Sequence, residues 1–247
     1  MVTASKTSLS TGRRSPIGEP GRHFVGAASW VAGVAAWLVL QIAAALQWVD
    51  PPYDWTTNYI SDLGNSTCGP FTVPGGETTY VCSPAYELMN TGFIVSGALT
   101  AIGAVLLWRY WPPVRLAQIA GGLWVLTGVG RVIVGLNPED VDITMHMVGA
   151  MMQSASSVAV ILAAIAIRKS SPALYGVGMT LGSLGAIGAG LAIGAQLGIT
   201  AFHLGVGPGL TERLASHPGQ VWLVVVGVVV MVTGSRDIQS RRVAAVA

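Results

Sequence analysis

The side chain with the clearest chemical potential in this 247-residue chain is an arginine inside an apolar segment. Arg131 lies about five residues before the end of the stretch 116–136, so at ~1.5 Å per residue it starts about 7 to 8 Å below that end. An arginine at the centre of a membrane span costs about 2.5 to 3.5 kcal/mol, and less near the edge. Either the side chain extends outward to the aqueous interface, or it pairs with an acid in the bundle or binds an anionic headgroup. The second alternative makes Arg131 a candidate binding residue.

Two polar residues of an earlier apolar segment are the expected neighbours of Arg131. Glu87 and Asn90 are three positions apart, which places both on one face of a helix. The carboxylate can exchange protons, and the amide can hydrogen-bond an anionic group. We therefore expect Glu87 to be a candidate acid or base and Asn90 a candidate binding residue.

A carboxylate and an imidazole open the fourth apolar segment. Asp142 and His146 are four positions apart and so share a helical face. A carboxylate beside an imidazole orients the ring and favours its charged form, as a proton relay or general base requires. In the alternative interpretation Asp142 caps the helix, because acids in a first turn complement the helix dipole.

Loop residues complete the candidate set. The candidate catalytic residues are Asp62, Glu87 and His146. The candidate binding residues are Ser61, Asn90, Arg131, Glu212 and Arg213. All of them are expected near one end of the apolar segments, which predicts a polar pocket at one face of the membrane.

The sequence identifies neither a metal site nor a cofactor. Three histidines, His146, His203 and His217, are expected at the same face as Asp62, but they lack the close ligand spacing of a zinc site. The phosphate loop, the dinucleotide-binding glycine motif, the hydrolase nucleophile elbow and the zinc-protease helix motif are also missing. We therefore expect no metal site, and the cofactor stays open.

The composition indicates what must position these residues. Hydrophobic residues make up 52% of the chain and charged residues only 10%, whereas a soluble domain carries about 25% charged residues. The mean hydropathy is +0.61. A helix needs ~20 mostly apolar residues to cross the hydrocarbon layer, and six such segments are present, at residues 24–49, 85–108, 116–136, 145–167, 173–199 and 218–234. The sequence predicts an all-α, six-span transmembrane helical bundle.

Basic residues predict the orientation of this bundle. Eleven of the 13 lysines and arginines flank the segments on one side, and only Arg213 falls on the other. The positive-inside rule then places both termini in the cytoplasm and the loop 50–84 outside it. Residues 1–21 and 235–247 are expected to be cytoplasmic tails, the first disordered. We expect a multi-pass protein of the plasma (inner) membrane, with membrane lipids as partners and no nucleic acid.

Both cysteines fall in the expected outer loop. Cys68 and Cys82 are the only two in the chain, and an oxidised pair is expected outside the cytoplasm. The sequence therefore predicts a disulfide between them.

The fifth segment carries small residues at a strict spacing of four, which keeps them near one helical face. Such a stripe lets another helix approach closely. We expect it to pack inside the bundle, with self-association or a partner helix as the alternative. The stripe consists of Gly178, Gly182, Ala186, Gly190, Gly194 and Gly198.

Several strings resemble a known family. Tyr59-Ile60-Ser61-Asp62-Leu63-Gly64, Ser83-Pro84 and Glu87-Leu88-Met89-Asn90-Thr91-Gly92-Phe93 are similar to the pattern of the small multi-pass membrane proteins grouped as domain of unknown function 998. Gly130-Arg131, Pro138, His146 and Gly209-Leu210-Thr211-Glu212-Arg213 fit the same pattern. The resemblance implies a six-helix membrane protein and leaves its activity open.

Three functions are compatible with these features. The leading hypothesis is an outward-facing pocket that binds or processes a lipid or another amphiphile. The first alternative is a small transporter or proton-coupled carrier, which would need polar groups at more than one depth. The second is a non-catalytic assembly or sensor subunit that docks through the glycine stripe.

Overall fold

The computed structural model describes residues 19–203 and 205–246. Residues 1–18 of the expected N-terminal tail lie outside this range. Within it, six helices are long and apolar enough to cross a membrane. They are α1 (Glu19–Gln47), α2 (Tyr86–Leu107), α3 (Arg115–Leu136), α4 (Ile143–Ile167), α5 (Pro172–Gln196) and α6 (Pro208–Val246). The predicted six-helix, all-α fold is confirmed.

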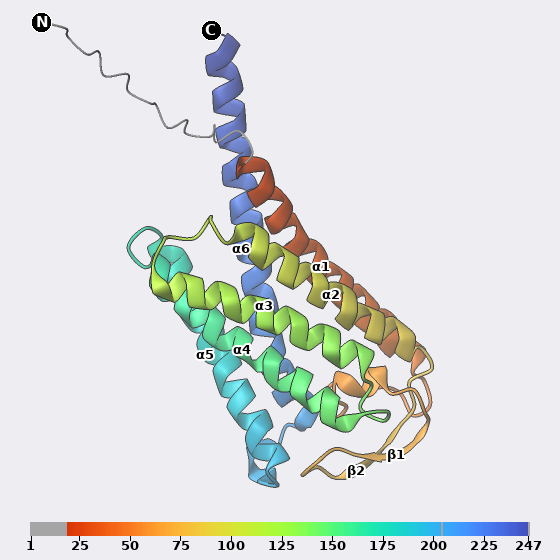
Figure 1. Ribbon diagram of the computed structural model, residues 1–247. Coiled ribbons are helices and arrows are strands. Elements are labelled where there is room, and N and C mark those ends of the chain that lie inside the picture. Colours follow the sequence, from red (N-terminus) through yellow and green to blue (C-terminus); the bar gives the residue numbers. More distant parts are fainter. Residues whose placement is uncertain (1–18, 204, 247) are drawn as a thin grey trace, which may run out of the picture.

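The helices form one bundle in which neighbours in sequence are neighbours in space. Each helix packs against the next, and α6 also packs against α1 and α4, which closes the bundle. The start of α1 and the end of α6 lie at the same end of the molecule (Figure 1). The loop between α1 and α2 lies at the opposite end, which we call the loop end. The positive-inside rule predicts that the loop end faces outward.

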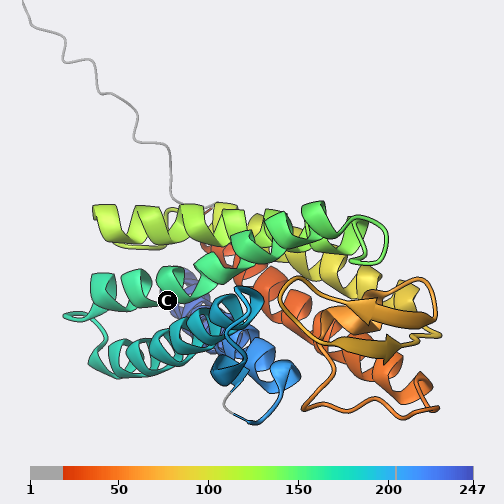
Figure 2. The same ribbon diagram turned by 90° about the horizontal axis from the view of Figure 1, so that it is seen from below.

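The loop between α1 and α2 is ordered by short elements of its own. It contains the 3₁₀ helix η2 (Ser61–Gly64) and the antiparallel strands β1 (Gly69–Thr72) and β2 (Thr78–Val81). Figure 2, viewed from the loop end, places this hairpin over the ends of α1 and α2. Cys68 and Cys82 form a disulfide at the base of the hairpin, as predicted. A second 3₁₀ helix, η3 (Thr200–His203), connects α5 to α6.

The last helix is longer than the sequence predicts. It begins at Pro208, ten residues before the expected start at Pro218, and its backbone stays helical through Val246. Either proline is suited to the first turn of a helix, because the backbone N–H groups there have no hydrogen-bond acceptor within the helix. The structure uses Pro208 in this way and carries Pro218 inside the helix. The extra turns bring a polar segment to the loop end of the bundle.

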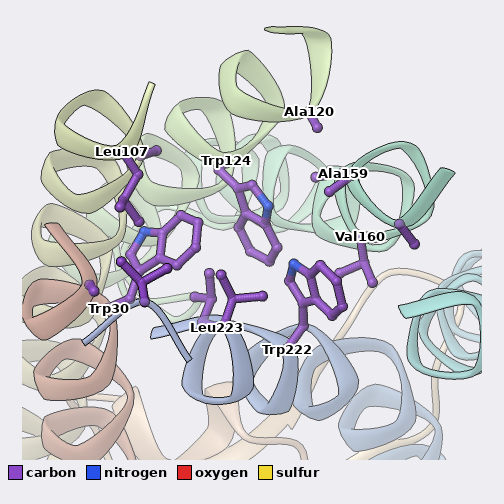
Figure 3. Close-up of a cluster of buried hydrophobic side chains, with 14 of the residues drawn as sticks. Trp30, Leu107, Ala120, Trp124, Ala159, Val160, Trp222 and Leu223 are labelled. Atoms are coloured by element: carbon purple, nitrogen blue, oxygen red, sulfur yellow. The ribbon is translucent and has the colours of Figure 1, made fainter. Parts of the chain in front are cut away.

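Two apolar clusters fill the bundle. The first cluster lies toward the end that holds the start of α1 and the end of α6, which we call the tail end. It centres on Trp30, Trp124 and Trp222, and Figure 3 shows their rings together with Leu223 between α1, α3 and α6. The cluster at the loop end joins the helices to the first loop through residues such as Leu63. The tryptophan cluster fills the centre of the bundle, and the polar side chains predicted to form the site lie at the loop end.

Glycines set how closely the central helices approach. A Cβ added to Gly130 of α3 would meet the carbonyl oxygen of Gly149 at 2.6 Å, and one added to Gly149 of α4 would meet that of Gly130 at 2.7 Å. A Cβ on Gly97 of α2 would lie 2.8 Å from the Cβ of Arg131. The backbones of α2, α3 and α4 therefore touch at the level of Arg131.

The glycine stripe of α5 does not stay on one face. A Cβ on Gly178 or Gly182 would collide with α4 side chains, whereas Gly190 has no neighbouring atom within 4 Å. A spacing of four residues advances about 40° per step around a helix of 3.6 residues per turn. Gly178 and Gly190 are three steps apart, so they point about 120° from each other. Part of the stripe packs inside the bundle, and part faces away from it.

Candidate functional site

A cavity of about 110 Å³ opens among the helices at the loop end. Side chains of α3, α4, α5, α6, the first loop and the loop between α3 and α4 line it. The polar lining residues are Tyr59, Ser61, Arg131, Glu139, His146, Gln153, Ser154, Ser156, Gln196, Glu212 and Ser216. The apolar wall comes mainly from α4 and α5, including Met147, Met151, Ala192 and Ile193.

Arg131 is a buried cation in the wall of this cavity. Only 3% of its surface is exposed, so the side chain does not extend to the aqueous interface. Its guanidinium carbon lies 5.4 Å from the ring centre of Trp37. Among the described residues none forms an ion pair with Arg131, and its Nε and one terminal nitrogen have no hydrogen-bond partner. The arginine therefore retains donors for a group that enters the cavity.

Two buried carboxyl groups meet beside the cavity. Asp62 of η2 and Glu139 of the loop between α3 and α4 are neighbours, and each shifts the pKa of the other. The Oδ2 atom of Asp62 accepts hydrogen bonds from the Asn58 side chain at 3.2 Å and the Tyr59 backbone N–H at 2.9 Å. Because two adjacent carboxylates repel, such a pair favours keeping one proton.

Burial of the two groups also favours the protonated form. Burial raises the pKa of Glu139 well above its ordinary value, and the neighbouring charge of Asp62 raises it further. Burial also raises the pKa of Asp62, although its hydrogen bonds oppose this shift. Asp62 and Glu139 therefore form a carboxyl pair in which holding one proton is favoured.

His146 faces Glu139 instead of Asp142. Its Nδ1 lies 2.9 Å from the carbonyl oxygen of Asn137, so Nδ1 carries a proton and donates it to that oxygen. Nε2 lies 3.9 Å from a carboxyl oxygen of Glu139. Asp142 accepts a hydrogen bond from the backbone N–H of Met145 at 3.0 Å, in agreement with the capping interpretation. The imidazole is thus oriented by the backbone and directed at the carboxyl pair.

The first turns of α6 supply the opposite wall. Glu212 lines the cavity and accepts a hydrogen bond from the backbone N–H of Ile60. Arg213 lies outside the cavity lining and donates to the carbonyl oxygen of Asn58 at 2.9 Å and to the Tyr53 hydroxyl. Its guanidinium also lies 5.2 Å from the ring centre of Trp55. The Arg213 side chain therefore holds the first loop against α6. Glu212 lines the cavity, so a ligand in the cavity can contact Glu212 but not Arg213.

Two expected site residues lie elsewhere. Glu87 is exposed, and the Tyr86 hydroxyl lies 3.5 Å from one of its carboxylate oxygens. The Asn90 amide donates to the carbonyl oxygen of Gly64 at 2.9 Å and so holds η2 against α2. Neither residue lines the cavity, whereas the expected Ser61 does.

Glu139 is the main site residue that the sequence did not suggest. It is 4% exposed although it lies in a short loop between two helices. Acids in loops are mostly solvent-exposed, so its type and position gave no reason to single it out. Pro138, two residues after the end of α3, indicates a turn there, but a turn alone does not show which residues Glu139 meets.

No group of three or more His, Cys, Asp or Glu side chains within residues 19–203 and 205–246 is arranged to hold a metal ion. Asp62 and Glu212 instead accept hydrogen bonds from backbone N–H groups, and Glu139 lies near the imidazole of His146. The arrangement can bind an ion of either charge and can transfer a proton.

A family model described as a protein of unknown function, DUF998, matches residues 30–229. The chain belongs to the DUF998 family. The DUF998 region covers four of the six apolar spans completely and most of the first and last, and it includes every residue that lines the cavity; the chain is an integral multi-pass membrane protein. No curated protein and no solved structure matches the chain.

The carboxyl pair of this DUF998 protein predicts a specific pH dependence. As the pH rises above the ordinary glutamate value of about 4.3, unfolded Glu139 loses its proton while the folded group keeps it. The free energy of unfolding therefore falls with rising pH until the raised pKa of the folded state is reached. Glu139→Gln stays neutral in both states, so we expect it to be more stable than wild type at pH 7 by at least ~1 kcal/mol.

Thermal melting in detergent between pH 4 and pH 8 measures this difference. The two curves should converge toward pH 4, where wild-type Glu139 is mostly protonated in the unfolded as well as the folded state. Glu87→Gln is the matched control, because Glu87 is exposed at the same end of the bundle, and it should melt in parallel with wild type. Parallel curves for Glu139→Gln as well would contradict a proton held by the pair.

Proposed function

We propose that the cavity binds the anionic group of a membrane amphiphile, with Arg131 as its principal ligand. The observation that carries the proposal is the buried guanidinium of Arg131, whose donors lack partners among the described residues. A cation that is removed from water without a counter-charge destabilises the protein that contains it. An entering phosphate or carboxylate compensates this cost through charge-assisted hydrogen bonds, each stronger than a neutral one.

The walls of the cavity support an amphiphile as the ligand. Most of its lining on α4 and α5 is apolar, and Met151 in that wall is 52% exposed on the outer surface of the bundle. Helices α4 and α5 are joined at the tail end and separate toward the loop end (Figure 1). A headgroup could reach Arg131 from this side while its acyl chains stay in the lipid.

The filled tail end favours binding over transport. Trp30, Trp124 and Trp222 are completely or almost completely buried and occupy the centre of the bundle beyond the cavity (Figure 3). A carrier needs a site that opens in turn to both faces. Three large rings in the path make a pocket open at one end the better-supported function.

Native mass spectrometry of the detergent-released protein tests the proposal. Protein reconstituted with equimolar phosphatidylethanolamine, phosphatidylglycerol and diacylglycerol should retain phospholipid but not the uncharged diacylglycerol. Arg131→Gln should lower phospholipid retention at least about tenfold, the effect of one lost charge-assisted interaction. Glutamine keeps much of the side-chain length, so the cavity wall remains filled.

Arg109→Gln is the matched control, because Arg109 is an exposed arginine at the tail end. It removes the same charge and should retain as much phospholipid as wild type. Equal retention by wild type and Arg131→Gln, with equal melting temperatures, would rule out Arg131 as the ligand.

A further inference from the structure

The cavity contains two opposite charges that do not pair with each other. Arg131 has unpartnered donors, and Glu139 has one carboxyl oxygen, Oε1, without a hydrogen-bond partner among the described residues. Both side chains are more than nine-tenths buried, and both line the same cavity. Within the described part of the chain the single ion pair that involves either of them is the 3.9 Å contact between His146 and Glu139. The protein thus holds a cation and an acid apart in one small space.

The cavity also contains acids, although none of the described residues forms an ion pair with Arg131. Glu139 and Glu212 both line it, and Asp62 lies beside Glu139. A ligand with only a negative charge is attracted by Arg131 but is repelled by any of these acids that is ionised. A ligand with one charge of each sign satisfies Arg131 and adds no net charge to the site.

We propose that the cavity recognises a zwitterionic amphiphile whose phosphate lies against Arg131 and whose primary ammonium lies against Glu139, the member of the carboxyl pair that lines the cavity. This inference rests on the proposed function, because it takes the same cavity and the same role of Arg131. It adds the class of ligand, a headgroup of the phosphoethanolamine type.

The acceptors of the site favour a primary amine over a methylated one. An ammonium group has three N–H donors. Glu139 offers Oε1, and His146 offers Nε2, because its proton is on Nδ1. A trimethylammonium group has no donor and would leave both acceptors unsatisfied, which costs free energy in a buried site. The small cavity, about 110 Å³, also suits the smaller headgroup.

Headgroup selectivity of the wild-type protein tests this inference without any substitution. The protein is incubated in mixed micelles with equimolar phosphatidylethanolamine, phosphatidylglycerol and phosphatidylcholine of identical acyl chains, and retained lipid is measured by native mass spectrometry. All three lipids have a phosphate, and only the first has a primary amine. We expect phosphatidylethanolamine to exceed each of the others at least about tenfold.

A double substitution locates the amine. Asp62→Asn with Glu139→Gln removes the charge of the carboxyl pair and nearly preserves its shape. This variant should retain phosphatidylethanolamine and phosphatidylglycerol about equally, through Arg131. Glu77→Gln with Glu87→Gln is the control, since both residues are exposed at the loop end, and it should keep the wild-type preference. Melting temperatures establish that both variants are folded.

The outcomes separate this inference from the proposed function. Wild type that retains phosphatidylglycerol as well as phosphatidylethanolamine, in an Arg131-dependent manner, overturns the zwitterion and keeps the anion site. Wild type that retains no phospholipid overturns both. Soluble glycerophosphoethanolamine has the same headgroup but no acyl chains, so it tests whether the ligand must be an amphiphile. If it binds as tightly as phosphatidylethanolamine, the cavity recognises the zwitterionic headgroup and the proposal that the ligand is an amphiphile is overturned.

Discussion

Replacing Gly130 by leucine should prevent the bundle from assembling in its native form. A single Cβ at this position would lie 2.6 Å from the carbonyl oxygen of Gly149 and 2.7 Å from the Cβ of Met152. Both neighbours belong to α4, and one of them is backbone, so neither can give way without moving the helix. Overpacking a well-packed interior costs about 1 to 3 kcal/mol, occasionally more. We expect Gly130→Ala to lie in this range and Gly130→Leu to exceed it.

The damage should reach the cavity directly. Gly130 precedes Arg131, and Gly149 lies one turn after His146 on α4. Forcing α3 and α4 apart would separate the guanidinium from the imidazole and the carboxyl pair. Size-exclusion chromatography and thermal melting should show loss of the monodisperse folded protein, and any folded fraction should retain no phospholipid.

Gly122→Leu is the control for this effect. Gly122 lies on the same helix, and a Cβ there would have no neighbouring atom within 4 Å. It adds the same side chain to α3 but points it away from the other helices, so melting and lipid retention should equal those of wild type. The interpretation of the glycine contact would be wrong if both variants behaved alike.

The fold was predictable because the membrane leaves few alternatives. Backbone polar groups have no water to bond in the hydrocarbon layer, so an apolar segment of sufficient length must become a helix. Length and composition alone therefore predicted the six helices. Where a boundary depended on tertiary contacts the prediction was wrong: residues 208–217 are polar like a loop, and Glu212 and Arg213 lie in the helix because they bond to the first loop.

The site was less predictable, because spacing along one helix does not say which neighbour a face meets. Arg131 and His146 were predicted site residues and line the cavity. Glu87 and Asn90 share a face, as their spacing requires, but that face is directed at solvent and at η2. Glu139 reaches the site only because the chain folds back after α3, and no local pattern encodes that approach.

The hairpin beside the cavity depends on Asp140, and Asp140→Ala should release it. One carboxylate oxygen of Asp140 accepts four hydrogen bonds, from the backbone N–H and the hydroxyl of both Ser66 and Thr67, each at 2.9 Å. These residues directly precede Cys68, at the base of the hairpin. A buried hydrogen bond to a charged group contributes about 1.5 to 3 kcal/mol. Each of these four bonds contributes less, because the carboxylate is partly exposed. We therefore expect the loss of all four to cost ~2 to 4 kcal/mol of local stability.

Amide hydrogen exchange over residues 66–82 measures this loss, because local opening sets the exchange rate. A local cost of ~2 kcal/mol or more corresponds to at least ~30-fold faster exchange. Asp142→Ala is the control, since this nearby carboxylate accepts only the cap bond from Met145 among the described residues, and it should leave the hairpin protected. If Asp140→Ala exchanges like wild type, the disulfide and strand pairing hold the hairpin without it.

Acidification should reproduce the substitution in the wild-type protein. Burial on its own would raise the pKa of Asp140, but the hydrogen bonds from Ser66 and Thr67 outweigh it and lower the pKa below its ordinary value. A lowered pKa means that this stabilisation is complete above the ordinary aspartate value of about 3.9 and disappears as the pH falls through the folded value. Glu139 changes stability in the opposite direction. In the wild-type protein, lowering the pH should therefore loosen the hairpin and, separately, reduce the destabilisation caused by the buried carboxyl pair. In Asp140→Ala, lowering the pH should only reduce the destabilisation caused by the carboxyl pair.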